Sequence, residues 1–203
     1  MNDKFFDLKK EKQDKMINAA LKIFSLSDYR RASTDDVVKM AGISKGLLFH
    51  YFTNKAGLYD FLYAYSLKYL AIELYQTVSI KEHDYFELLK QIQKAHLLVM
   101  KQYPYMAAFL EKAEEETDEE VVPLIAAKRA ERKKEYEAIF DRADRNGWKE
   151  NVNIELATNI IHFTLKGIEH TFVRLEEFIP EEMNKRIEEY LNFLKPAMYE
   201  ITD

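Results

Sequence analysis

The side chains between Thr34 and Lys55 belong to the types that bind phosphate oxygens and the edges of nucleic-acid bases. A lysine donates to a guanine edge or a phosphate, a glycine lets the backbone approach a base, and an apolar side chain can contact a thymine methyl group. The candidate contacts are Thr34, Ser44, Lys45, Gly46, Leu47, His50, Tyr51 and Lys55. Together these residue types favour double-stranded DNA as the partner.

Each candidate has a chemical role that its position suggests. Thr34 stands at a helix start, where a hydroxyl and free amides can hold a phosphate. His50 and Tyr51 at the end of a helix can donate to phosphates, as can Lys55 at the start of the next. A single lysine or histidine is more often a solvated charge. Six suitable groups on one outward face instead favour DNA contact.

Helix caps and a glycine turn must position these side chains. Ser33 is a helix N-cap, Gly42 stands where a tight turn needs positive φ, and Ser44 is a second N-cap. Thr53 or Asn54 caps a third helix. This layout predicts a helix-turn-helix that places its second helix in the major groove.

Composition and periodicity predict an all-α protein of about nine helices. The 203 residues include only five glycines and four prolines, and apolar residues recur with helical spacing. A shorter helix starts at Pro104, and the longer helices span 9–25, 55–78, 83–102, 123–145, 154–178 and 181–199. We place the domain boundary near Lys55, with an N-terminal three-helix domain over 1–54 and a helical bundle over 55–203.

Charge and cysteine content narrow the cellular context. The net charge is −5, and we count +3 on residues 1–60 and −8 on the remainder. The mildly basic N-terminal third is compatible with DNA, whereas the acidic body would repel it. The chain has no cysteine, no signal peptide and no apolar run of about 18 residues. We therefore expect a cytoplasmic, soluble protein without a membrane partner.

Catalytic and metal-binding patterns are missing from the sequence. We find no Ser-His-Asp arrangement, no phosphate-cradling loop and no Glu-x-x-His pattern, so we expect no enzyme and no cofactor. His162 and His170 lie about 12 Å apart along a helix, too far to share an ion. The acidic run 114–120 lacks the spacing of a calcium loop, and we interpret it as a solvated connection.

The segment AGISKGLLFHYFTNKAGL resembles the tetracycline-repressor (TetR/AcrR) family of bacterial transcription regulators. The close match covers about residues 15–62, and the rest agrees in length and helix count. The resemblance implies a homodimer with N-terminal DNA-reading heads and a C-terminal body that binds a small molecule and thereby relieves repression. Family DNA contacts carry over to Thr34, Ser44, Lys45, Gly46, His50, Tyr51 and Lys55. The chain departs from the usual pattern at Asp28, Val38, Leu47, Phe49 and Gly57, which leaves the base preference open.

Aromatic and methionine side chains are frequent in the C-terminal body. Such side chains line apolar pockets, although ordinary core packing explains each of them singly. The expected effector pocket therefore rests mainly on the resemblance. Its candidate residues are Tyr65, Tyr69, Phe86, His96, Met100, Tyr103, Phe109, Tyr136, Phe140, His162 and Phe163.

The last two helices carry more apolar surface than one bundle face needs. By family analogy they form an isologous dimer face, and a monomeric core is the competing explanation. The residues in question are Ile160, Phe163, Leu165, Ile168, Ile187, Tyr190, Leu191 and Leu194.

The first hypothesis for function is a homodimeric repressor released from its operator by a small, largely apolar effector. The helix from Lys55 to Val78, which joins the reading head to the body, would transmit the change. The alternative is a helical small-molecule carrier or enzyme whose N-terminal hairpin is structural. An activator or a regulator without an effector is a third reading that the sequence does not separate from the first. The effector, the operator sequence, the regulated genes and the number of dimers per operator are not encoded in any pattern we find.

Overall fold

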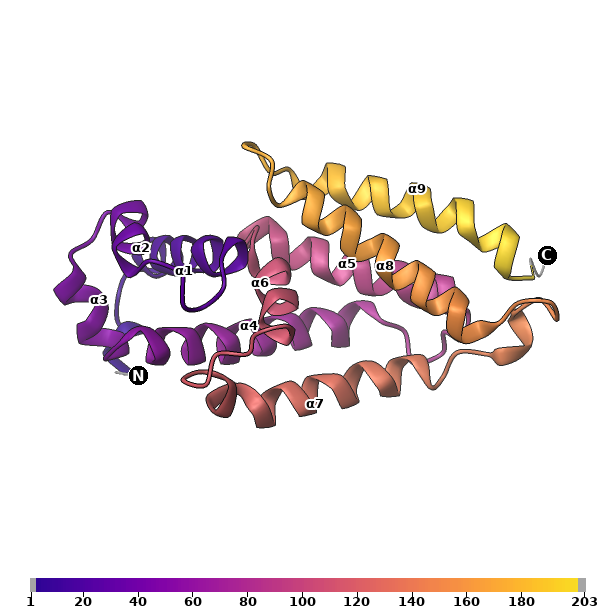
Figure 1. Ribbon diagram of the computed structural model, residues 1–203, viewed down its shortest axis with the longest axis horizontal. Helices are drawn as coiled ribbons and strands as arrows, with labels where there is room; N and C mark the ends of the chain where they lie inside the picture. Colours follow the sequence, from indigo (N-terminus) through magenta and orange to yellow (C-terminus); the bar gives the residue numbers. More distant parts are fainter. Residues whose placement is uncertain (1–2, 201–203) are drawn as a thin grey trace. The chain divides into compact units, whose positions relative to one another are not determined.

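The computed structural model describes residues 3–200, and within that range every regular element is helical (Figure 1). Trp148 and Tyr199 form an isolated backbone bridge without a strand on either side. The predicted all-α fold and the predicted number of helices are confirmed. The helices are α1 Lys10–Leu26, α2 Thr34–Ala41, α3 Lys45–Phe52, α4 Lys55–Thr77, α5 Tyr85–Gln102, α6 Met106–Glu114, α7 Val122–Phe140, α8 Ile154–Phe172 and α9 Pro180–Met198, with short 3₁₀ turns at Asp3–Phe5 and Arg145–Gly147.

The chain forms two compact units. The first unit comprises Met1–Leu70 and Val99–Lys133, and the second comprises Ala71–Leu98 and Lys134–Asp203. Helices α4, α5 and α7 each contribute residues to both units. The boundary predicted near Lys55 divides the chain by function, into a DNA-binding domain and a helical bundle. The two compact units do not test that division, so it stays a prediction.

The first unit has a core of aromatic side chains. Helix α1 lies against α2 and α6, and its apolar side chains, among them Leu21 and Phe24, are buried. The ring of Phe24 meets Tyr59 edge-on at a centroid distance of 5.1 Å, and Tyr59 in turn meets Phe109 at 5.2 Å. Burial of such large side chains is the main stabilising contribution in a domain of this size.

One residue of the acidic run 114–120 differs from the prediction of a solvated connection, whereas residues 115, 117, 119 and 120 are exposed as predicted. Glu116 is buried, and its carboxylate accepts hydrogen bonds from the backbone amides of Tyr29 (2.8 Å), Thr117 (2.9 Å) and Asp118 (2.9 Å). A buried carboxylate is stable when N–H groups saturate its oxygens. The run therefore fastens the segment that follows α1 to the segment that follows α6.

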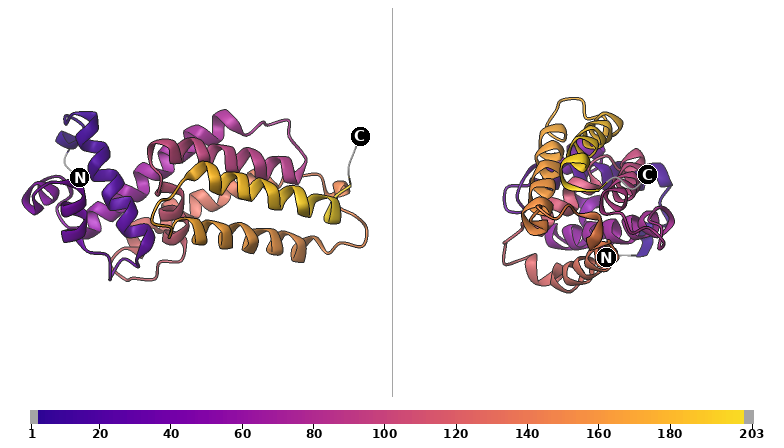
Figure 2. Two further views of the ribbon diagram at one scale, coloured as in Figure 1. Left: turned by 90° about the horizontal axis from the view of Figure 1, so that it is seen from above. Right: turned by 90° about the vertical axis from the view of Figure 1, so that its right-hand side faces the viewer.

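The second unit contains α8 and α9, which lie side by side (Figure 2). Their buried residues, among them Ile161, Ile187 and Leu191, form one side of the pair. An aromatic cluster supports the ends of these helices, where Trp148 lies 5.3 Å from Tyr199 and 6.1 Å from Phe86 between ring centroids.

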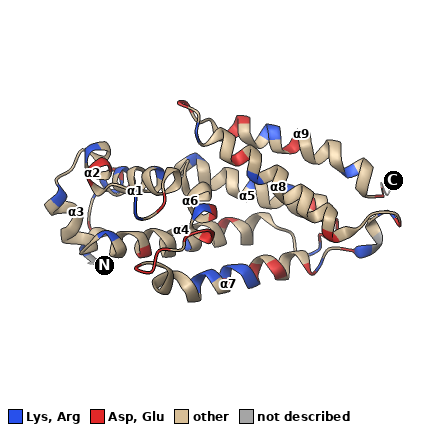
Figure 3. Ribbon diagram, in the orientation of Figure 1, with Lys and Arg blue, Asp and Glu red and all other residues tan. Residues whose placement is uncertain are grey.

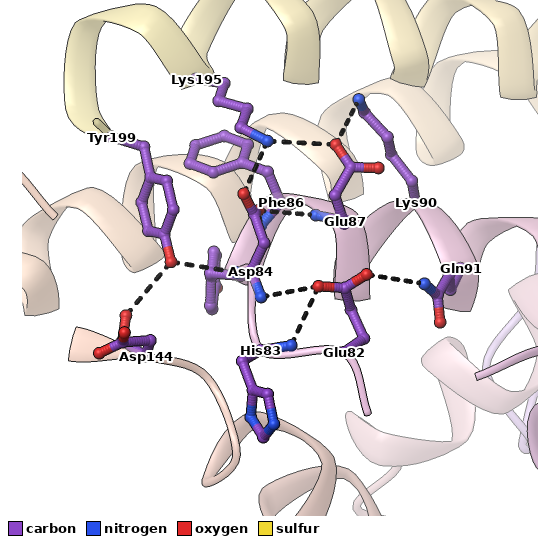
Figure 4. Close-up of polar contacts among 11 residues, drawn as sticks. Glu82, His83, Asp84, Phe86, Glu87, Lys90, Gln91, Asp144, Lys195 and Tyr199 are labelled. Atoms are coloured by element: carbon purple, nitrogen blue, oxygen red, sulfur yellow. Dashed lines mark hydrogen bonds and ion pairs between the residues drawn. The ribbon is translucent and has the colours of Figure 1, made fainter. Parts of the chain in front are cut away.

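A polar cluster ties the C-terminal end of α9 to the start of α5 (Figure 4). The ammonium group of Lys195 lies 2.8 Å from the carboxylate of Asp84 and 3.1 Å from that of Glu87. Next to it, Glu82 accepts hydrogen bonds from the amide of Asp84 and from the side chain of Gln91. These bonds fix the loop between α4 and α5. Among the described residues, no helix is long and apolar enough to cross a membrane.

Candidate functional site

Two serine caps set the ends of the predicted helix-turn-helix. The hydroxyl of Ser33 accepts from the amide of Asp36 at 3.3 Å, and that of Ser44 accepts from the amide of Leu47 at 3.2 Å. Each cap satisfies an amide that the first turn of its helix leaves unpaired, which stabilises the helix start by about 1 kcal/mol. Both caps lie at the positions predicted from the sequence.

The turns before α3 and after it have special backbone geometry. Gly42 adopts φ 66° and ψ 38°, the left-handed conformation predicted for the turn between α2 and α3. After α3, Thr53 has φ 67°, and Asn54 rather than Thr53 caps α4 by accepting from the amide of Gly57 at 2.7 Å. A Cβ atom at Gly57 would collide with the carbonyl oxygen of Phe52, so α4 can start this close to α3 only with glycine there.

The start of α3 forms an exposed surface with a backbone that is open to approach. Ser44, Lys45 and Gly46 are all exposed, and a Cβ atom added to Gly46 would meet no other atom within 4 Å. His50, nearer the end of the helix, is also exposed, while Leu47 is half-buried. Lys45 is the only lysine or arginine on this helix (Figure 3). This surface could therefore meet a base edge without any rearrangement of the helix.

An ion pair connects the starts of α2 and α3. The ammonium group of Lys45 lies 2.8 Å from the carboxylate of Asp35, and both side chains are largely exposed. Asp35 follows the half-buried Thr34, another candidate contact. Because an exposed pair of this kind stabilises by at most about 1 kcal/mol, Lys45 can exchange its partner for a phosphate or a base. Sequence reasoning missed the role of Asp35.

Tyr51, a predicted phosphate contact, is mostly buried. It is 8% exposed, and its ring meets that of Phe5 edge-on at 5.7 Å. Phe5, which is fully buried, also packs on Phe52 at 5.0 Å and on Phe61 at 5.3 Å. The N-terminal 3₁₀ turn thus supports the inner side of α3, a contact that no local sequence pattern indicates.

Lys55 is held by the segment between α1 and α2. Its ammonium group donates to the carbonyl oxygen of Arg30 at 3.3 Å and lies 4.4 Å from the ring centroid of Tyr29. Burial lowers the pKa of Lys55, and nearby carboxylates, including Glu120, act in the opposite direction. A phosphate contact from Lys55 therefore requires its ammonium group to leave these partners or to share them.

The predicted pocket residues of the first unit form two groups. The hydroxyls of Tyr65 and Tyr103 lie 2.8 Å apart, and the ring of Tyr69 meets that of Tyr103 at 5.0 Å. Tyr103 also donates to Asp14 at 2.7 Å. Phe109 lies in the separate aromatic core with Phe24 and Tyr59, and Met100 is buried as well.

The predicted pocket residues of the second unit are dispersed. A ring nitrogen of His96 lies 2.8 Å from the hydroxyl of Tyr136, and Phe140 packs on Tyr85. Phe86 belongs to the aromatic cluster around Trp148, whereas His162 and Phe163 are exposed. None of the eleven predicted residues lines the hollow between the last turns of α4 and the end of α7, and the predicted pocket stays a prediction. Among the described residues, no three metal-binding side chains come together.

Comparison with known proteins agrees with this geometry. Residues 16–61 match the family described as "Bacterial regulatory proteins, tetR family". This match covers the end of α1, both helices of the helix-turn-helix and the start of α4, and it confirms the resemblance predicted from the sequence. No curated protein matches the chain by sequence.

Solved structures share the fold over nearly the full length. A TetR family transcriptional regulator from Chloroflexus aurantiacus is 20% identical, with TM-score 0.62 and coverage of 98% of this chain and 99% of that chain. One from Thermus thermophilus is 21% identical, with TM-score 0.57 and coverage of 88% and 96%. The ketosteroid transcriptional regulator of Mycobacterium tuberculosis is 16% identical, with TM-score 0.65 and coverage of 99% and 97%. The N-terminal region of the chain, residues 16–61, therefore belongs to the tetR family of bacterial regulatory proteins, which makes the protein a DNA-binding transcriptional regulator.

Proposed function

We propose that the protein is a homodimeric repressor that a small, largely apolar effector releases from its operator in the cytoplasm. Residues 1–54 would read the DNA, and residues 55–203 would form the dimer and bind the effector. The observation that carries this proposal is that one chain contains both a preformed helix with an exposed start, α3, and large exposed apolar side chains on α8 and α9.

The exposed start of α3 supports the choice of DNA contacts. Ser44, Lys45 and Gly46 present a hydroxyl, an ammonium group and bare backbone on one surface, with His50 beside them. Thr34, Leu47, Tyr51 and Lys55 complete the proposed set at its edges. The hydroxyl edge of Tyr51, whose ring packs on Phe5, would be the part that reaches a phosphate.

The dimer is proposed from the outer side of α8 and α9. Large apolar side chains on this side are exposed, and those with the largest exposed fractions are Leu156 (61%), Phe163 (69%) and Phe193 (78%). Leu156 and Phe163 lie two helical turns apart on α8 and therefore point to the same side of that helix. Exposed large apolar side chains gathered in this way indicate an interaction surface. A second copy can cover it by a two-fold axis, because both helices then meet their own counterparts. Ile187 and Leu191, which the sequence placed with this surface, are instead buried in the protomer.

Release by an effector follows from linkage. A two-fold dimer binds successive major grooves when its reading helices lie about 34–36 Å apart. An effector that binds better to a dimer with a different spacing weakens DNA binding by the factor by which DNA weakens effector binding. Helix α4 starts three residues after α3 and is the covalent route for such a change.

The first experiment measures binding of the purified protein to the DNA upstream of its own gene. The measurement runs across a salt series with scrambled competitor DNA, because phosphate contacts make binding weaken steeply with salt. We expect tight binding that survives the competitor at physiological salt and is lost in Gly46→Val. Equal losses by Gly46→Val on specific and scrambled DNA would remove Gly46 from base reading. Binding to neither DNA by a folded dimer would overturn the proposal.

A further inference from the structure

The second unit contains a hollow of about 790 Å³ between the last turns of α4 and the end of α7. Its wall is mostly apolar, with Leu74, Val78, Ile80 and Ile139 among the lining residues beside the charged Glu135 and Arg142. A volume of this size is that of a small-molecule site. None of its lining residues was among the predicted pocket residues.

Arg142 lines this hollow and has hydrogen-bond donors without an acceptor among the described residues. Its Nε donates to the carbonyl oxygen of Ile139 at 3.4 Å, and no described residue accepts from its two terminal nitrogen atoms. The side chain is half-buried. A guanidinium group with two free terminal NH₂ groups matches the two oxygens of a carboxylate, which makes this the ligand group it binds best among small organic anions.

Hydrogen bonds hold the backbone on both sides of the hollow, at Arg142 and at Ser79. The Nδ1 atom of His83 lies 2.8 Å from the carbonyl oxygen of Arg142, and because a carbonyl only accepts, Nδ1 carries the proton. The carbonyl of His83 accepts from the amide of Asp144 at 2.7 Å. On the other side, the side chain of Gln91 accepts from the amide of Ser79 at 2.7 Å and donates to Glu82 (Figure 4). These bonds therefore hold both loops that flank the hollow.

The apolar part of the hollow suits a hydrocarbon body. Leu74 and Val78 form a buried floor, while Tyr75 and Ile80 at the rim are 89% and 78% exposed. Side chains this exposed gain most from contact with an apolar ligand, because the contact removes them from water. They are placed to cover a ligand that lies along the floor.

Glu135 limits which ligand groups the hollow accepts besides the carboxylate on Arg142. It lines the hollow on α7, is exposed, and has no described partner. A second carboxylate on the ligand would meet this charge and be repelled. A ligand with one acidic end is therefore favoured over one with two.

From these observations we propose that the hollow binds an amphipathic monocarboxylate, with its carboxylate on Arg142 and its apolar body along Leu74, Val78 and Ile139. The inference rests on the proposed function, since it names the class of effector that would act on the regulator. It adds to that function the site of the effector, the hollow at α4 and α7, and the negative charge that the effector carries.

The test is equilibrium dialysis of the full chain with decanoate, and with decanol and decanedioate as probes of the same chain length. We expect decanoate to bind saturably, and decanol and decanedioate to bind at least about tenfold more weakly, since each loses or opposes the contact with Arg142. Arg142→Gln should weaken decanoate binding about tenfold to a hundredfold and leave decanol unchanged. The matched control is Arg145→Gln, which removes an exposed arginine that does not line the hollow and should leave binding as it is.

A second variant locates the site without touching a charge. Ala138 is exposed and lines the hollow, so Ala138→Trp fills it at little cost to folding, and decanoate binding should be lost. Equal decanoate binding by wild type and Arg142→Gln, binding that survives Ala138→Trp, or no binding at all would overturn the inference.

The same samples separate this inference from the proposed function. Decanoate that binds through Arg142 but leaves the operator complex intact would support the site and contradict its role in release. Release of the operator by some other compound, together with absent decanoate binding, would support the proposed function and sink the inference.

Discussion

The two compact units differ in how completely they bury their large apolar side chains. Among the described residues, three large apolar side chains of the first unit are strongly exposed, namely Phe6, Met40 and Leu124. In the second unit there are eleven, concentrated at the end of α4 and on α8 and α9. The difference teaches that the first unit is closed by its own contacts, whereas the second presents surface for another molecule.

Polar groups do not follow this division, because Asn18 Oδ1, Ser66 Oγ and Arg129 Nε are buried atoms of the first unit without a hydrogen-bond partner among the described residues. In the first unit the buried guanidinium of Arg132 lies 2.6 Å from Glu111 and 2.8 Å from Glu114, and Glu114 also accepts from the hydroxyl of Tyr63. In the second unit Arg142 and Glu135 face the hollow with donors and acceptors to spare.

The largest expected effect separates two phenylalanines. Phe24→Ala removes a ring that is 1% exposed in the core of the first unit, and it should lower the free energy of unfolding by about 3–5 kcal/mol. Phe193→Ala removes a ring that is 78% exposed, and in a dilute monomer it should change that free energy by less than about 0.5 kcal/mol. Urea unfolding at low protein concentration measures both. Similar losses from the two substitutions would end the comparison between the units.

The next effect concerns association. Phe163→Ser together with Phe193→Ser should weaken dimerisation by about a hundredfold or more, because the substitutions remove several buried rings from a two-fold interface. The helical content of the monomer should stay as it is. Sedimentation equilibrium measures the dimer constant, and Phe6→Ser, which alters a 49% exposed ring of the first unit, is the matched control. A double variant that still dimerises like wild type would show that another surface forms the dimer.

A third test asks whether the reading surface can be changed without changing the fold. Gly46→Ala adds a Cβ atom that meets nothing within 4 Å, and alanine favours a helix over glycine by up to about 1 kcal/mol. The variant should therefore unfold no more easily than wild type. It should nevertheless bind its operator about tenfold to a hundredfold more weakly, because the methyl group stands between the backbone and the base edge. Unfolding and operator binding are measured on the same preparation, and unchanged operator affinity would contradict the role of Gly46.

Features fixed by neighbouring residues were predictable from the sequence. The caps at Ser33 and Ser44 involve amides three residues away, and the positive φ of Gly42 follows from the turn itself. These local rules were enough to place the helix-turn-helix and the number of helices. Helix ends were less accurate, since α7 ends at Phe140 rather than near Arg145.

Features that depend on distant contacts were not predictable. The burial of Glu116 requires the amide of Tyr29, which lies 87 residues away in the chain, and a charged run by itself indicates only solvent. The packing of Phe5 against Tyr51 and Phe52 has the same character. The hollow beside Arg142 arises where α4 and α7 meet, so no single segment carries a pattern for it. The DNA contacts rest on local spacing and stay predictions until DNA binding is measured.

The smallest expected effect is a change in the free energy of unfolding that comes from the polar cluster around Lys195. In this cluster the charged groups of the second unit pair with one another. Burial alone would raise the pKa of Glu87, but hydrogen bonds from Lys90 and Lys195 overcome it and hold the pKa below its usual 4.5. A carboxyl group with a lowered pKa in the folded state stabilises the protein above the pKa of the unfolded chain. That contribution is lost as the pH falls through the lower, folded value.

Glu87→Gln should therefore lower the free energy of unfolding near pH 7 by less than about 1 kcal/mol, because the side chain is 39% exposed and solvent screens its ion pairs. The difference from wild type should shrink as the pH falls below 4.5 and vanish once Glu87 is protonated in both states. Urea unfolding across pH measures this difference, and Glu131→Gln, at an exposed position of α7, is the control. A difference that is the same at every pH would mean that Glu87 acts by its shape rather than by its charge.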